Sequence, residues 1–234
     1  KDPRINYEPL LERDLPGIES ELEPEVMARR YEQCHTALES LRVSVEGADL
    51  DAIVIIGDDQ HEQFHENNMP MFSIFYGDEI PVVARGRRDS ALQAAWAGTS
   101  WQSRQSKLPQ GSFPSEPQLA RHIIASFIDQ GIDISTCNSL ANSTGAGHAF
   151  AFLYRYILPN GNVPVVPLMV NTFFKPNQPT ANRCYEVGQA LRQAIQEWLP
   201  GKRIGVMASG GLSHVIIDEQ LDRAVLNAME QKDQ

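Results

Sequence analysis

The 234-residue chain lacks three features that would place it in a special class of protein. It has no run of about 18 apolar residues, so we expect no transmembrane helix and no membrane partner. Its three cysteines, Cys34, Cys137 and Cys184, are scattered and form no Cys-x-x-Cys motif, which favours a reducing cytoplasm over a disulfide framework. Basic residues are few: 20 Lys and Arg against 30 Asp and Glu give a net charge of −10, which argues against nucleic acid as a partner.

The chain does contain enough apolar residues, 42% of the sequence, to bury a sizeable core. Segments that resemble strands alternate with segments of helical spacing, which predicts an α/β fold with a mostly parallel or mixed central sheet flanked by helices. The predicted helices are 23–48, 119–129 and 183–199, and the predicted strands are 51–56, 71–75, 80–83, 132–137, 163–170 and 204–207. We expect 51–56, 163–170 and 204–207 to be buried. Pro164 and Pro167 predict an irregular or edge position for the strand that contains them.

The segment from Arg85 to Pro117 follows neither pattern and is predicted to be a long loop or lid. It contains Trp96, Trp101 and a basic cluster at Arg85–Arg88. These side chains could cover a bound ring, or they could belong to a solvated loop.

Two predicted strands end in polar loops that carry histidine and carboxylate side chains. The strand 51–56 leads into Gly57-Asp-Asp-Gln-His-Glu62, with His65 close behind, and the strand 204–207 leads into Ala208-Ser-Gly-Gly-Leu-Ser-His214, followed by Asp218 and Glu219. Ligands of open α/β sheets bind beside the carboxyl ends of the strands. Neutral imidazoles and a carboxylate together suit a metal ion. Each loop alone could be a solvated turn, and it is the pairing of two such strand ends that favours a metal site.

Four sequence blocks, in order over about residues 51–226, resemble the class III extradiol ring-cleavage dioxygenases, the family of the protocatechuate 4,5-dioxygenase catalytic subunit. The blocks are Gly57–Glu62, Gly145–Phe150, Val170–Thr180 with Arg183-Cys184, and Ala208–His214 with Asp218-Glu219 and Leu221-Asp222. They are most similar to the gallate and 3-O-methylgallate dioxygenase branch. The resemblance implies a phosphorylase/hydrolase-like α/β fold, one catalytic domain over residues 1–234, and a homo-oligomer with or without a small second subunit.

The resemblance also implies a non-haem Fe(II) site made of two histidines and one carboxylate, with the opposite face open to a catechol and O2. His61 would be one ligand, with His65 as the alternative. Glu219 would be the carboxylate; a shift of one residue in the alignment would select Gln220, which cannot supply an anionic ligand. The family takes its other histidine from an N-terminal Ser/Thr-His segment, which we expect upstream of Lys1. A non-catalytic paralogous subunit with an incomplete metal site is the alternative function.

Two further histidines are candidates for acid–base chemistry on the implied catechol, His148 and His214. His148 could instead make a structural bond at the start of a helix, and His214 could orient Glu219 or His61. Lys175 stands where many relatives have the acid–base histidine, and it could bind a substrate carboxylate or be solvated.

Arg183 and Asn171 complete the candidate substrate-binding residues. Arg183 could also contact another subunit, and Asn171 could serve the structure of its loop. The implied substrates are catechol-type aromatics, including carboxylated ones such as gallate, 3-O-methylgallate and protocatechuate.

A serine hydrolase that uses Ser209 or Ser213 with His214 is a weaker alternative. Neither serine stands in a Gly-x-Ser-x-Gly motif, the turn that exposes a nucleophilic serine in many hydrolases.

Overall fold

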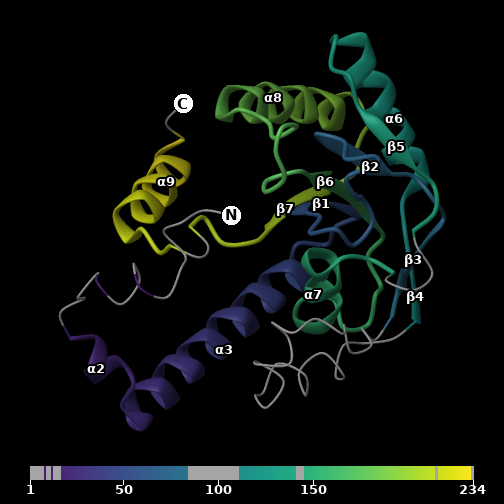
Figure 1. Cartoon of the computed structure of the whole chain (residues 1–234). Helices are drawn as coiled ribbons and strands as arrows, with labels where there is room; N and C mark the ends of the chain where they lie inside the picture. Colours follow the sequence, from purple (N-terminus) through teal and green to yellow (C-terminus); the bar gives the residue numbers. More distant parts are fainter. Residues whose placement is uncertain are drawn as a thin grey trace. The chain divides into compact units, whose positions relative to one another are not determined.

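The computed structural model describes Glu8, Glu12 and residues 17–83, 111–140, 145–213 and 216–232 (Figure 1). The chain divides into two compact units, one made of residues 37–209 and the other of residues 1–36 and 210–234. Within the described residues, no helix combines the length and the apolar character that crossing a bilayer requires.

A five-stranded mixed sheet forms the centre of the unit 37–209, with the strand order β5-β2-β6-β1-β7. Its strands are β1 Ala52–Asp58, β2 Phe72–Phe75, β5 Ser135–Cys137, β6 Val165–Val170 and β7 Ile204–Ser209. β1 pairs in parallel with β6 and β7, whereas β2 runs antiparallel to β6. β3 Glu79–Val82 and β4 Gly111–Pro114 form a separate antiparallel pair. The predicted α/β fold with a mixed central sheet is confirmed.

Helices cover both faces of this sheet (Figure 1). They are α6 Pro117–Asp129, α7 His148–Tyr156, α8 Ala181–Glu197 and the C-terminal part of α3 Pro24–Gly47. On β1, Ile53 and Ile55 pack with α7, while Ala52 and Val54 pack with α6 and α8, because successive strand residues point to opposite faces. A strand that is covered on both faces must be apolar throughout, which explains the unbroken apolar run of β1.

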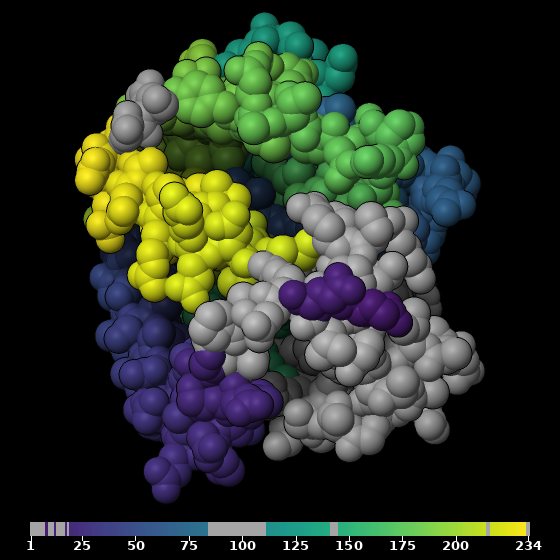
Figure 2. Space-filling view, turned by 60° about the vertical axis from the view of Figure 1, so that its left-hand side comes forward, coloured from purple at the N-terminus to yellow at the C-terminus, as the bar shows by residue number. Residues whose placement is uncertain are grey.

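The helices α6 and α8 lie side by side, and their surfaces adjoin in the space-filling view, teal and green respectively (Figure 2). His122 of α6 makes a 2.8 Å hydrogen bond between its Nε2 and the carbonyl oxygen of Ala194 in α8. Thr180 caps α8 as an N-cap residue should, since its hydroxyl accepts the backbone N–H of Arg183 at 3.2 Å.

Two expectations about strand position are wrong. β6 is buried along its whole length, as expected, but it is a central strand and not an edge strand. Its ladder with β2 ends at Leu168, so Pro167, which has no N–H, lies outside that ladder. β7 was expected to be buried, but it lies at the end of the strand order and is only half-buried, with Val206 55% exposed.

The predicted loop from Arg85 to Pro117 is wrong over its last residues. Gly111–Pro114 forms β4, and Pro117 begins α6. β4 exists because it pairs with β3, about 30 residues earlier in the chain, and that partner is invisible to a local pattern. Residues 84–110, with Trp96, Trp101 and the Arg85–Arg88 cluster, lie outside the described residues.

The other unit contains α2 Ile18–Glu21, the N-terminal part of α3 and α9 Glu219–Gln231. The hydroxyl of Ser213 accepts the backbone N–H of Asp218 at 3.0 Å and hydrogen-bonds the carboxylate of Asp222 at 2.8 Å. Asp218 in turn caps α9 by accepting the backbone N–H of Leu221 at 3.0 Å. The segment that precedes α9 is therefore fixed to the first turn of that helix.

Candidate active site

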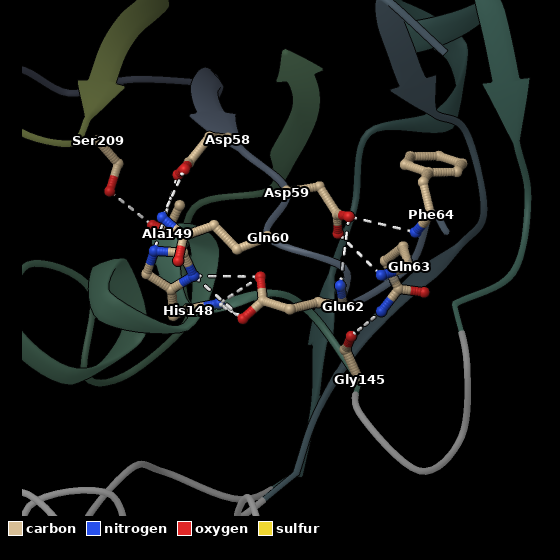
Figure 3. A network of polar contacts seen from close by, with 10 residues as sticks. All are labelled: Asp58, Asp59, Gln60, Glu62, Gln63, Phe64, Gly145, His148, Ala149 and Ser209. Atoms are coloured by element: carbon tan, nitrogen blue, oxygen red, sulfur yellow. Dashed lines mark hydrogen bonds and ion pairs between the residues drawn. The ribbon is translucent and has the colours of Figure 1, made fainter. Parts of the chain in front are cut away.

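The loop that follows β1 is organised around Asp59, which is 5% exposed. Its carboxylate accepts the backbone N–H groups of Glu62 at 3.2 Å, Gln63 at 2.8 Å and Phe64 at 3.2 Å (Figure 3). Burial raises the pKa of the Asp59 carboxyl above its ordinary value, and the N–H groups and nearby histidines offset this only in part. One buried carboxylate thus fixes the path of the segment that carries His61.

His61 occupies the middle of this loop in a left-handed backbone conformation, with φ at +59°, which is uncommon for a residue with a Cβ. Its ring stacks on Phe174, with ring centroids 3.6 Å apart and planes within 8° of parallel. The ring of His65 is 5.6 Å away, centroid to centroid. No hydrogen bond joins the ring nitrogens of His61 to another residue in the described part of the chain. An imidazole held by stacking keeps its nitrogens for a ligand.

Asn171, at the end of β6, positions Phe174. Its side chain is buried, and its amide nitrogen donates to the backbone carbonyls of Phe174 at 2.8 Å and Asn177 at 2.9 Å. Its amide oxygen accepts the N–H of Phe174 at 2.8 Å. This geometry makes Asn171 the support of the ring that contacts His61, and its role in substrate binding stays a prediction.

His148 begins α7, and its side chain turns back toward the loop after β1 (Figure 3). Its Nδ1 is 3.0 Å from the nearer carboxylate oxygen of Glu62, and its Nε2 is 3.7 Å from Asp58. The hydroxyl of Ser209, at the end of β7, donates to the carbonyl oxygen of Ala149 at 2.6 Å. The carboxyl ends of β1 and β7 and the start of α7 therefore meet at one place, and His148 lies there.

The predicted metal ligands are divided between the two units. Glu219 is the first residue of α9, where its side chain is 76% exposed and 3.4 Å from Arg223. In the described residues no group of three or more His, Cys, Asp or Glu side chains is placed to hold a metal ion. His214 lies outside the described residues. The donors fit a metal in part: the imidazole of His61 and the carboxylate of Glu219 are types that Fe(II) accepts, and their joint role as ligands stays a prediction.

The remaining candidates are on the surface or in structural bonds. Lys175 is exposed in the loop after β6, and Arg183 lies in the first turn of α8, paired with Glu186 at 3.0 Å. The hydroxyls of Ser209 and Ser213 both make hydrogen bonds within the chain, as described above, which does not favour a serine nucleophile.

Three residues of this site were not predicted from the sequence to act in it: Asp59, Glu62 and Phe174. Asp59 and Glu62 belong to the block around His61, and a carboxylate so close to a histidine in a loop is itself a signal. Asp59 accepts backbone N–H groups of its own loop, whereas the partner of Glu62 is a histidine 86 residues away, which no local pattern reveals. Phe174 carries no signal of its own, because an aromatic residue in a loop has many possible partners.

The fold and the site define an α/β protein whose candidate active site lies at the carboxyl ends of parallel strands. The family model of LigB, the catalytic LigB subunit of aromatic ring-opening dioxygenase, matches residues 20–234. The chain belongs to this family. The resemblance to extradiol dioxygenases that the four blocks predicted is thereby confirmed.

Two relatives are similar to this chain over different lengths. A gallate dioxygenase from Pseudomonas putida is 34% identical over 105 residues, which are 44% of this chain and 29% of the relative. A 2,3-dihydroxyphenylpropionate/2,3-dihydroxicinnamic acid 1,2-dioxygenase from Mycolicibacterium paratuberculosis is 27% identical over 210 residues, which are 90% of this chain and 55% of the relative. The chain thus spans about half or less of the length of these relatives.

Proposed function

We propose that the protein is a non-haem Fe(II)-dependent extradiol dioxygenase that opens the ring of a catechol-type aromatic with O2. The observation that carries this proposal is membership of the LigB family together with a histidine and carboxylate loop at the end of β1. Extradiol dioxygenases of this family generally use a metal. The names of the relatives make gallate and 2,3-dihydroxyphenylpropionate, both carboxylated catechols, the first candidate substrates. The resemblance of the sequence blocks adds 3-O-methylgallate and protocatechuate.

His61 and Glu219 would hold the iron, together with a histidine that is not among the described residues. When bound, the metal supplies a Lewis-acid and redox centre that brings the catechol and O2 together. Phe174 and Asn171 would keep the imidazole of His61 in one orientation, because a stacked ring cannot rotate freely.

The residues around the iron would handle protons and substrate charge. His148, and with it His214, would accept the proton of a catechol hydroxyl and return a proton later, since an imidazole titrates near neutral pH. Lys175 and Arg183 would attract a substrate carboxylate.

The proposal is tested by anaerobic Fe(II) loading, followed by desalting, metal analysis and O2 uptake against a panel of catechols. We expect wild-type protein to retain about one iron per chain, and His61→Ala and Glu219→Gln to lose it while circular dichroism stays unchanged. The matched controls are His65→Ala and Gln220→Ala, which should retain iron. Stoichiometric iron in both His61→Ala and Glu219→Gln would exclude these residues as ligands.

The same experiment separates the enzyme from a non-catalytic subunit of the same fold. A folded full-length protein that neither retains iron nor consumes O2 with any catechol would be such a subunit. We further propose a cytoplasmic homo-oligomer, with or without a small second subunit, and a single monomeric species in sedimentation at micromolar concentration would contradict the oligomer.

A further inference from the structure

Glu62 is the most deeply buried carboxylate of the described residues, at 1% exposed. Both of its oxygens face His148: the backbone N–H of His148 is 3.0 and 3.2 Å from them, and Nδ1 is 3.0 and 3.1 Å from them (Figure 3). Burying a carboxylate is costly unless hydrogen bonds compensate it. Here the compensation includes both the main chain and the side chain of one histidine.

The position of Glu62 suits a carboxylate that accepts hydrogen bonds from His148. The N–H of His148 belongs to the first residue of α7, where backbone donors lack partners inside the helix and a negative charge is stabilised. The preceding residue, Gly147, provides the space, since a Cβ there would overlap a carboxylate oxygen of Glu62. The start of α7 therefore supplies a hydrogen-bond donor to the Glu62 carboxylate, and Gly147 leaves the space that it occupies.

Both oxygens of Glu62 accept the backbone N–H of His148 and lie within hydrogen-bond distance of its Nδ1, so this geometry makes the carboxylate the acceptor and Nδ1 the nitrogen that carries the hydrogen. We propose that Glu62 is a positioning residue that holds His148 in one ring orientation and in the Nδ1–H tautomer, which leaves Nε2 as the nitrogen that exchanges protons. Nε2 is the nitrogen directed to Asp58, 3.7 Å away, and the His148 side chain as a whole is 38% exposed. This inference rests on the acid–base role of His148 in the proposed function.

The loop after β1 connects the candidate metal ligand His61 to the candidate acid–base residue His148. Glu62 directly follows His61 in the chain, and Asp59 holds both residues in one loop through the N–H of Glu62. The loop that would present an imidazole to the metal thus also sets the orientation of the acid–base histidine. A change in this loop should affect both, even though His148 belongs to another helix.

The test is a long-range ¹H–¹⁵N correlation spectrum of the full chain, labelled with ¹⁵N-histidine and free of metal, at a pH where the rings are neutral. His148→Ala identifies the signals of His148 among the six histidines. We expect the Nδ1–H tautomer in the wild type and a shift toward the Nε2–H tautomer in Glu62→Gln. The control is Glu66→Gln, an exposed acid of the same loop, which should leave the spectrum of His148 unchanged.

An Nε2–H tautomer in the wild type, or an unchanged tautomer in a folded Glu62→Gln protein, overturns the proposal. The wild-type spectrum alone decides the matter if Glu62→Gln does not fold. Because these readouts need neither iron nor turnover, they fail independently of the proposed function. In active enzyme at equal iron content, we expect kcat/KM of Glu62→Gln to fall about 10- to 100-fold. Full turnover in that variant would overturn the link between Glu62 and proton transfer.

Discussion

Replacing Asp59 by alanine should destabilise the unit 37–209, because three backbone N–H groups lose one shared acceptor. An unpaired buried donor costs about 1–3 kcal/mol. Of the three donors, the N–H of Glu62 belongs to a buried residue, whereas Gln63 and Phe64 are half-buried, so water can replace part of what they lose. These losses suggest about 2–4 kcal/mol in total.

One effect opposes this loss. Burial of the Asp59 carboxyl, which raises its pKa, is itself unfavourable for the ionised group, and alanine removes that cost. We therefore expect a net decrease of about 1–3 kcal/mol in the free energy of unfolding. Asp59→Asn keeps one acceptor oxygen and should lose less.

The assay is equilibrium urea unfolding followed by far-ultraviolet circular dichroism, with hydrogen exchange of the Gln63 amide as a local probe. That amide has the shortest of the three bonds, 2.8 Å, and should lose its protection in Asp59→Ala. Glu66→Ala is the control, since a change at an exposed residue usually stays within about 0.5 kcal/mol. A stability of Asp59→Ala within about 0.5 kcal/mol of wild type, with the Gln63 amide still protected, would refute the reasoning.

Three further outcomes are expected. Phe174→Ala should keep the fold but weaken iron binding about 10-fold, because the ring of His61 loses its stacking partner; unchanged affinity in a metal titration would show that the stack is incidental. Gly57→Ala should lower the free energy of unfolding in urea by about 1–3 kcal/mol, because the new Cβ would lie 2.8 Å from the Cβ of Ala149 in α7. Gly188→Ala, in the middle of α8 with open space around it, should instead raise that free energy by about 0.5–1 kcal/mol. Burial raises the pKa of Cys137 from 9.0 to about 11, which lowers the fraction of reactive thiolate near pH 8. Its alkylation by iodoacetamide, followed by mass spectrometry, should therefore be about 100-fold slower in native than in unfolded protein, and equal rates would contradict this.

Local patterns were sufficient for the elements whose burial is uniform. The apolar run 51–56 predicted β1, and helical spacing predicted α6 and α8, because a strand or helix that packs against a core must repeat apolar residues at its own period. Helical spacing also predicted α3, although Val45 is its one buried residue. The four family blocks could also be recognised from the sequence alone. Their order along the chain was enough to indicate the LigB family that the comparison confirmed.

The sequence by itself therefore determined the fold class, the identity of the polar loops and the family, since each is encoded in short segments and in the order of those segments along the chain. Only the tertiary structure decided that β6 is central and β7 an edge strand, because strand order depends on pairing between distant segments. It alone brought Glu62 to His148 and Phe174 to His61. Such contacts depend on how the carboxyl ends of β1 and β6 and the start of α7 meet in space, and no spacing within one segment carries that information.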